Sequence, residues 1–247
     1  MKRLLGYLIA LVLIFAGWWA LAACVNSPAL PTPVPAVAAL FEDFRRILPH
    51  VGISTYRIVV AMIIGMGLAL PVGLAIGRSR RLQFVGTPLI HLLYPIPKVV
   101  FLPVLLVLLG LGQAPKVILI ALVIFFQTLV SVRDAARAIP EPLLKSVRAF
   151  GAKRFDILWQ VILPATTPAL FTSLRINVGT SIAILFLAES IAGDSGIGYY
   201  IMQMWGMIDY QAMFAGIIAM AVMGVALYEI LELIEHLGLR WQRAGTD

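Results

Sequence analysis

The chain has 247 residues, of which 61% are hydrophobic and only 13% are charged, and its formal net charge is +7. A soluble domain carries about a quarter charged residues, so this composition excludes an ordinary soluble protein. The single cysteine, Cys24, excludes a disulfide framework and a cysteine-based metal site.

Six apolar stretches are each close to the length that crosses a hydrocarbon core of about 30 Å. None shows the alternation of a lipid-facing barrel strand, and backbone groups in lipid must bond within their own segment. The sequence therefore predicts an all-α membrane protein with one transmembrane domain over residues 1–247. The predicted spans are residues 4–23, 53–77, 84–110, 116–132, 168–190 and 211–234.

The first span, in residues 1–23, has a second interpretation. Its apolar run ends in residues 21–24, and this pattern resembles a lipoprotein signal peptide that is cleaved before Cys24. Trp18, Trp19 and the length of the run favour a retained span, because a signal core has roughly 7 to 15 apolar residues. Cleavage would leave five spans in the same orientation.

Residues 24–50 are predicted to form an external connector. Four prolines in its first part remove backbone donors and favour an extended chain. Residues 36–48 have apolar side chains at helical spacing, which predicts an amphipathic helix on the outer membrane surface. The prolines are Pro28, Pro31, Pro33 and Pro35.

Residues 51–132 hold the second, third and fourth spans. Glycines and alanines in the second span predict close contact with neighbouring helices. The third span contains Pro95, Pro97 and Pro103, which predict a bend that frees polar backbone groups near the membrane middle. Such groups need protein or water around them.

The basic residues predict the orientation of the chain. Thirteen of the nineteen lysines and arginines lie in four groups, which six crossings place on one side. Because cytoplasmic loops are enriched in lysine and arginine, both termini are predicted to be cytoplasmic. Membrane insertion thus explains the positive charge better than nucleic acid binding does. The groups are Lys2 and Arg3; Arg78, Arg80 and Arg81; residues 133–154; and Arg240 and Arg243.

Residues 133–165 form the longest predicted cytoplasmic segment, and residues 166–237 after it hold the last two spans. The pattern of the cytoplasmic segment predicts two short helices, 142–150 and 153–162. Gly151 is expected to end the first, and Pro164 is expected to close the second. Their apolar side chains form a ridge that is expected to bind another protein. The ridge comprises Leu143, Leu144, Val147, Phe150, Phe155, Leu158, Trp159 and Ile162.

The same segment resembles the loop that permease subunits of ATP-binding-cassette (ABC) importers insert into their ATPase partners. Its usual form is E-A-A, three residues, Gly, nine residues and I-x-L-P. Here K-S-V begins at Lys145, Gly151 follows after three residues, and V-I-L-P ends at Pro164. Lys145 stands where the motif has an acid. By this resemblance, the ATPase-coupling residues are Lys145, Ala149, Phe150, Gly151, Leu163 and Pro164.

The chain also resembles one branch of these permeases, which serves nitrate, sulfonate, taurine and pyrimidine-precursor importers. The resemblance implies the type I importer fold in a bacterial cytoplasmic membrane, and a homodimer with two ATPase subunits and an external binding protein. It implies a small anionic solute, with a pyrimidine or vitamin precursor as the alternative. The matching positions are residues 30–33, 54–57, 97–110, Arg175, Ala188, Glu189 and residues 195–198.

The sequence contains no G-x-x-x-x-G-K-[ST] motif, which cradles phosphate in many nucleotide hydrolases. The chain is therefore expected not to be an enzyme and to hold no cofactor. ATP and magnesium are expected in the partner ATPase.

Two other function classes compete with the importer. Residues 193–196 read G-D-S-G, as in serine proteases, but Ser195 would need a base from His50, His91 or His236. The alternative is a glycine-rich turn at the outer end of the fifth span. A secondary transporter is the third class, although the sequence shows no inverted repeat and no dense set of intramembrane acids.

Five residues are candidates for the substrate pathway. Lys98 stands near the middle of the third span, where a cation is costly unless it faces water or a partner, and it suits an anionic solute. Its alternative is a surface or subunit contact. Asn177, Thr180 and Ser181 place small polar groups in the fifth span. Glu189 is an acid near the outer end of that span, with a structural hydrogen bond as the alternative.

Overall fold

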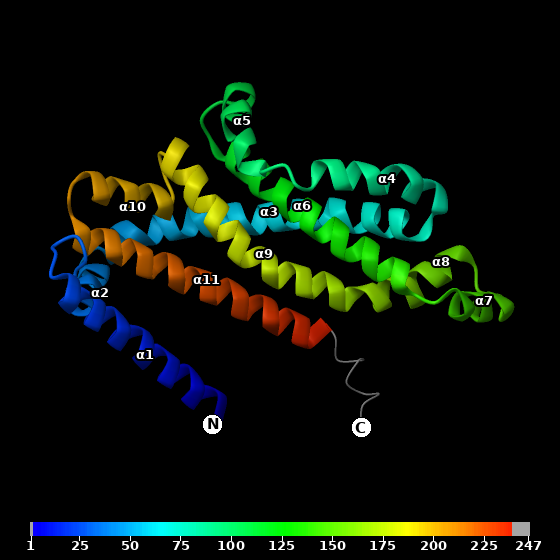
Figure 1. The fold of residues 1–247 in the computed structure, drawn as a ribbon, viewed down its shortest axis with the longest axis horizontal. Coiled ribbons are helices and arrows are strands. Elements are labelled where there is room, and N and C mark those ends of the chain that lie inside the picture. The colour runs from blue at the N-terminus through cyan, green and yellow to red at the C-terminus, as the bar shows by residue number, and fades with distance from the viewer. Residues whose placement is uncertain (1, 239–247) are drawn as a thin grey trace. The chain divides into compact units, whose positions relative to one another are not determined.

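The computed structural model describes residues 2–238, and its regular elements in that range are all helices (Figure 1). The predicted all-α membrane fold is confirmed. Five described helices are long and apolar enough to cross a membrane, and a sixth span results if one bent helix pair is a single crossing. The helices are α1 Lys2–Val25, α2 Pro33–Glu42, α3 Phe44–Arg78, α4 Arg80–Leu93, η1 Lys98–Phe101, α5 Leu102–Leu109, α6 Gln113–Ala138, α7 Glu141–Ala149, α8 Arg154–Ile157, η2 Leu158–Ile162, α9 Leu163–Ala192, α10 Ile197–Gly206 and α11 Tyr210–Gly238.

The chain folds as two compact units. The first comprises the residues up to Ser54 together with Glu189–Met223, and the second comprises Thr55–Ala188 together with the residues from Gly224 onward. Helices α3, α9 and α11 each contribute residues to both units.

In the first unit, α1 is joined to the chain that follows it. The Trp18 indole N–H donates to the Pro31 carbonyl oxygen at 3.0 Å, and its ring stacks on Phe214 of α11 with the centroids 5.4 Å apart. Most of the described α1 side chains are exposed, as expected for a span that contacts lipid.

The connector of the first unit is shorter than predicted. Pro33 is the first residue of α2, a position where the missing proline N–H costs nothing. The prediction of one amphipathic helix over residues 36–48 is wrong, because α2 ends at a turn at Asp43 and Phe44 opens the 35-residue helix α3. Periodicity alone did not reveal that turn, since apolar residues recur on both sides of it.

In the second unit, α3 packs closely on α6. A Cβ atom added at Gly65 would lie 2.8 Å from the Ala121 carbonyl oxygen, and one added at Gly77 would lie 2.6 Å from that of Arg133. The predicted close helix contact of this span is therefore confirmed. Of the five unbroken candidate spans, α6 is the most buried.

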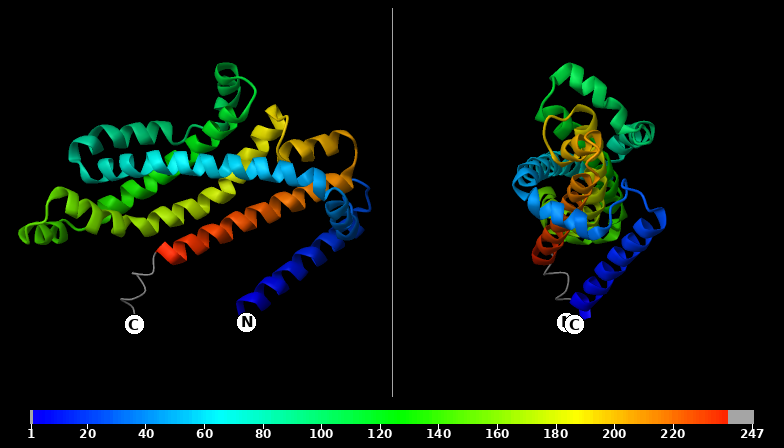
Figure 2. Two further views of the ribbon diagram at one scale, coloured as in Figure 1. Left: turned by 180° about the vertical axis from the view of Figure 1, so that it is seen from behind. Right: turned by 90° about the vertical axis from the view of Figure 1, so that its left-hand side faces the viewer.

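The predicted third span is broken (Figure 2). Helix α4 runs back along α3, and it meets the segment formed by η1 and α5 at an angle of 81°. Pro95 and Pro97 lie in the break, as the sequence predicted. Because proline cannot donate a backbone hydrogen bond, the helix ends here and resumes as the 3₁₀ turn η1.

The cytoplasmic segment of the prediction contains α7 and α8. Gly151 ends α7 as expected, with a φ of +88° that favours glycine. The prediction that Pro164 closes the second short helix is wrong, because α8 continues through the π-helical turn η2 into α9, a 39-residue stretch over Arg154–Ala192. In η2 the Leu163 N–H donates to the carbonyl of Leu158, five residues earlier, instead of four residues earlier as in an α-helix. Because the bonding is already shifted here, Pro164, which has no N–H to donate, does not end the helix.

The helix α10 was not predicted. The sequence predicted only a glycine-rich turn between the fifth and sixth spans, whereas the ten residues after that turn form a helix whose buried face includes Ile197, Tyr200 and Met204. The cytoplasmic placement of the termini stays a prediction, and Arg240 and Arg243 lie outside the described residues.

Candidate functional site

The turn between α7 and α8 carries large exposed aromatic side chains. Phe150 is 92% exposed and Phe155 is 68% exposed, and the Phe155 ring lies 5.8 Å from that of Trp159. The predicted ridge is divided, because Leu144 and Ile162 face inward and join the core of the second unit. The turn therefore has an inner face that fixes it to the spans and an outer aromatic face.

Hydrogen bonds hold the turn in one shape. The Gly151 N–H donates to the Arg148 carbonyl at 2.9 Å, and the Asp156 carboxylate accepts from the Lys153 N–H at 2.9 Å. At the start of α7, Glu141 pairs with Arg78 of α3 at 3.2 Å. These bonds tie α7 and α8 to the end of a membrane span.

The predicted coupling residues fall into two groups. Lys145, Ala149, Phe150 and Gly151 are exposed at the end of α7. Leu163 and Pro164 are half-buried in the first turn of α9, where Thr167 Oγ1 donates to the Leu163 carbonyl at 2.7 Å. Their coupling role stays a prediction.

Lys98 caps the broken end of α4. Its ammonium donates three hydrogen bonds, to the carbonyls of Leu93 at 2.6 Å, Tyr94 at 2.8 Å and Ile96 at 2.8 Å. The Nζ atom also lies 4.6 Å from the centroid of the Phe126 ring. All three of its hydrogens thus have acceptors at the break, and one of these is the Leu93 carbonyl, whose α-helical donor position four residues on is Pro97.

A small pocket lies beside Lys98. Its volume is about 230 Å³, and its lining includes Lys98, Gln127 of α6 and Ile184 of α9. The third, fourth and fifth predicted spans therefore meet at this pocket.

Polar side chains gather between α6 and α9 in what we call the Asn177 cluster, formed by Thr128, Ser173, Asn177 and Ser181. The Asn177 amide donates to Thr128 Oγ1 at 3.0 Å and to Ser173 Oγ at 3.3 Å. Among the described residues, Asn177 Oδ1 and Ser181 Oγ are buried without a hydrogen-bond partner. Thr180, the third predicted residue of this span, is half-buried and bonds to the Ile176 carbonyl.

Glu189 lies in the first unit, within what we call the Glu189 cluster, formed by His50, Ser54, Glu189 and the first residues of α10. Its carboxylate is fully buried and accepts from Ser54 Oγ at 2.8 and 3.0 Å and from the Gly198 N–H at 2.8 Å. Ser54 Oγ accepts from the Ile197 N–H, and His50 Nδ1 accepts from the Gly196 N–H. Three side chains thus bind the N–H groups that open α10.

Gly196 fits this cluster for a steric reason. Its φ is +107°, and a Cβ atom here would strike the Glu189 carboxylate. Tyr200, further along α10, donates to Asp43 Oδ2 at 2.9 Å, and burial together with this bond raises its pKa. Glu189 is therefore bound in a structural network, and a role in the pathway stays a prediction.

The geometry around Ser195 is that of a turn. Its hydroxyl donates to Asp194 Oδ1 at 2.9 Å, while His50 Nδ1 accepts from the Gly196 backbone. The Ser195 hydroxyl is thus bonded to its neighbour Asp194, and the His50 imidazole is bonded to the backbone of the turn.

Sequence analysis did not find the partners of two arginines in the spans. Arg57 is fully buried in α3, and its Nε donates to Gln113 at the start of α6. Arg175 of α9 pairs with Glu235 of α11 at 3.2 Å. A charged residue inside an apolar stretch is a signal for such a site, but the identity of its partner is not visible in the sequence.

Comparison with known proteins identifies the family. Residues 59–237 match the family described as "Binding-protein-dependent transport system inner membrane component". The putative aliphatic sulfonates transport permease protein SsuC of Bacillus subtilis is 30% identical over 222 residues, covering 89% of this chain and 80% of SsuC. The taurine transport system permease protein TauC of Escherichia coli is 28% identical over 227 residues, covering 88% of this chain and 82% of TauC.

A solved structure shares the fold. The MetNI methionine ABC transporter in an inward-facing conformation matches with a TM-score of 0.62 at 21% identity, covering 78% of this chain and 94% of the matched chain. The predicted importer permease fold is thus confirmed. The chain is therefore neither a protease nor a secondary transporter but a membrane-spanning permease component of ABC importers, a member of the binding-protein-dependent transport system inner membrane component family.

Proposed function

We propose that this permease imports a small anionic solute, of the sulfonate or taurine type, by alternating access coupled to a separate ATPase. The observation that carries the proposal is the exposed aromatic face of the α7–α8 turn, whose α8 continues into the fifth predicted span. An aromatic surface of this kind is suited to bind another protein. Movement of that protein is then passed directly to a span.

The proposed assembly rests on this surface and on the family of the chain. Two permease subunits form the pathway, each α7–α8 turn binds one ATPase subunit, and an external binding protein delivers the solute. ATP and magnesium bind in the ATPase, since this chain has no phosphate-binding motif. The assembly lies in a bacterial cytoplasmic membrane with the α7–α8 turn inside.

The proposed path passes between the third and fifth predicted spans. The pocket beside Lys98 is lined from these spans and from α6, and buried polar oxygens of Asn177 and Ser181 have no partner among residues 2–238. Buried polar groups require hydrogen bonds, so a polar solute or water passing here would satisfy them. The positive charge of Lys98 favours an anion.

The solute class rests on relatives. SsuC is described as a permease for aliphatic sulfonates and TauC as one for taurine. Both names describe solutes with a sulfonate group, which fits a path that contains a lysine. We therefore expect uptake of taurine or an alkanesulfonate rather than nitrate or a pyrimidine precursor.

The test is a Gly151→Trp variant in the complete importer reconstituted in liposomes. A Cβ atom at Gly151 meets no atom within 4 Å, but the φ of +88° strains any side chain there, so we expect the variant to disturb the turn without a clash in the spans. We expect most ATP-dependent uptake of radiolabelled taurine to be lost while the subunit still inserts. The assay compares uptake and ATPase co-purification with those of the natural chain.

Gly110→Trp provides a matched control. Gly110 also has a positive φ, +76°, and open surroundings, but it lies between α5 and α6. Uptake should persist in this control. Unchanged uptake and unchanged ATPase co-purification in Gly151→Trp would refute the coupling assignment.

A further inference from the structure

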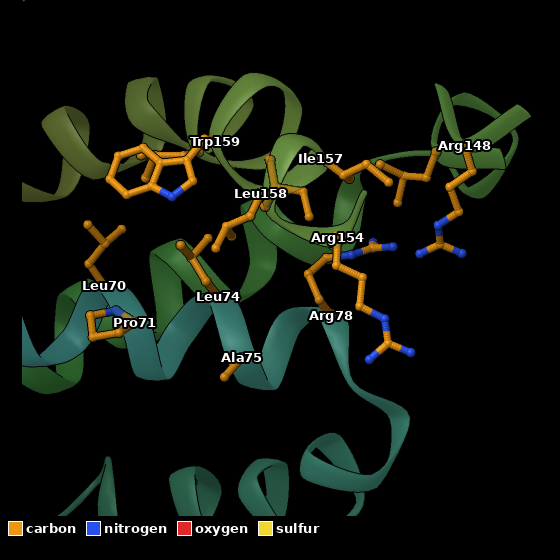
Figure 3. A pocket seen from close by; sticks show the side chains of 13 residues that line it. Leu70, Pro71, Leu74, Ala75, Arg78, Arg148, Arg154, Ile157, Leu158 and Trp159 are labelled. Carbon is orange, nitrogen blue, oxygen red and sulfur yellow. The ribbon is translucent and has the colours of Figure 1, made fainter. Parts of the chain in front are cut away.

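A large pocket lies beside the α7–α8 turn (Figure 3). Its volume is about 660 Å³, and its walls come from the end of α3, from α7, and from the continuous α8, η2 and α9. Ligand pockets in proteins span about 300–1,000 Å³. The pocket lies entirely within the second unit.

The two ends of this pocket differ in character. Figure 3 shows Leu70, Pro71 and Trp159 at one end, and Arg78, Arg148 and Arg154 toward the other. The lining contains no acidic residue. An occupant that fits both ends has an apolar tail and an anionic head.

The arginines at the charged end are available to a ligand. Arg78 already pairs with Glu141 and donates to the Ala136 carbonyl. Arg148 and Arg154 are exposed, and within residues 2–238 their guanidinium groups form no ion pair or hydrogen bond. Asp156, the nearest acid in the chain to Arg154, caps the Lys153 N–H. Guanidinium groups bind phosphate oxygens in two-pronged geometry.

The position of the pocket along a candidate span favours a lipid over a segment of a protein partner. Its apolar wall includes Leu70 and Leu74, which belong to the candidate span α3, while Arg78 is the last residue of that helix. Arg78 therefore marks the end of a candidate span, where lipid phosphates are expected, and Trp159 has the side chain type that is enriched at the membrane interface. An acyl chain suits that apolar wall better than a water-soluble partner does.

We propose that this pocket binds an anionic phospholipid, with its phosphate between Arg148 and Arg154 and an acyl chain along Leu70, Leu74 and Trp159. Basic pockets between membrane helices bind anionic headgroups in this way. The lipid fills the space between α3 and the α7–α8 turn, so it stabilises the turn in the shape that presents Phe150 and Phe155.

The test is native mass spectrometry of the full chain in detergent with equimolar phosphatidylglycerol and phosphatidylcholine. We expect phosphatidylglycerol adducts to exceed phosphatidylcholine adducts by about tenfold, since each basic residue near the surface adds to the attraction. The preference should vanish in the double variant Arg148→Gln/Arg154→Gln. Arg154→Gln alone, at an exposed position, should weaken it.

The control is Arg80→Gln/Arg81→Gln, which removes two exposed charges next to Arg78 that do not line the pocket. It should retain the preference. Equal binding of the two lipids to the natural chain, or equal loss in both double variants, would overturn the proposal. So would a Arg148→Gln/Arg154→Gln chain that keeps the lipid preference but no longer binds the ATPase, since the arginines would then serve the protein partner.

Discussion

The two buried polar clusters of this permease are built from similar residues but differ in how their groups are bonded. In the Glu189 cluster, the carboxylate accepts from Ser54 and Gly198, and Ser54 in turn accepts from Ile197. In the Asn177 cluster, Asn177 Oδ1 and Ser181 Oγ are buried without a partner among the described residues.

The two clusters thus differ in how completely their own groups are bonded, although Ser190 Oγ, next to Glu189 in the first unit, is also buried without a partner among the described residues. A buried network whose members are all bonded fixes one conformation, whereas a buried group without a partner carries a cost of about 1–3 kcal/mol. The first unit uses its network to hold α10. The second unit leaves oxygens unpaired on the face where we place the solute path.

The largest effect is expected from Glu189→Ala. The change leaves the Ser54 hydroxyl and the Gly198 N–H buried without their acceptor, which costs about 3 kcal/mol. We expect a lower melting temperature in detergent and new protease cleavage in α10. Both are measurable on the purified subunit.

Ser195→Ala is the control for Glu189→Ala. Ser195 lies in the same turn but bonds to Asp194 beside it, so its removal should leave stability and uptake unchanged. A Glu189→Ala chain as stable as this control would contradict the structural role of the cluster.

An intermediate effect is expected from Lys98→Met. The carbonyls of Tyr94 and Ile96 lose the ammonium as a donor, and that of Leu93 keeps only the Ile96 N–H at 3.3 Å. This loss costs about 2 kcal/mol, and the pocket also loses its charge. We expect lower thermal stability together with slower uptake at equal protein level. Lys98→Gln should also slow uptake, whereas Lys98→Arg keeps the charge and should retain much of it. Full activity in Lys98→Gln would show that no anion depends on this lysine.

The smallest effect on stability is expected from Asn177→Ala. Asn177 Oδ1 has no partner to lose, and Thr128 and Ser173 remain bonded to each other at 3.3 Å. We expect a loss below about 1 kcal/mol but a clear loss of uptake. A melting temperature as low as that of Glu189→Ala would reverse our comparison of the two clusters.

Cysteine labelling tests whether the fifth predicted span lines the solute path. In a Cys24→Ser background, cysteines at positions 177, 180 and 181 are expected to react with a water-soluble thiol reagent in a state-dependent way. Inert cysteines at all three positions would place the path elsewhere.

The helices could be predicted from the sequence because the features that mark them are local in the chain. Apolar length predicted the spans, Pro95 and Pro97 predicted the break, and Gly151 predicted the end of α7. The motif around Gly151 also predicted the family.

The features that the sequence did not predict depend on residues far apart in the chain or on neighbouring structure. Ser54 and Glu189 are 135 residues apart, so their bond depends on the folded arrangement of α3, α9 and α10. Pro164 is tolerated only because a π turn forms before it. The carbonyls that bind Lys98 are available only because α4 ends before them, which the sequence does not show. The sequence therefore left two roles open for Lys98, in the solute path or in a surface or subunit contact.

The π-helical continuity of α8 with α9 has a mechanical consequence. Between Arg154 and Asn177 the chain advances by about 35 Å at 1.5 Å per residue, as one continuous helical stretch that includes the π turn and Pro168. A tilt of about 5° at the coupling end of such a rod displaces its far end by about 3 Å, comparable to the width of a water molecule. We therefore expect the aromatic turn to act as the short arm of a lever, because a modest rotation there is large enough to open or close a path for a small solute.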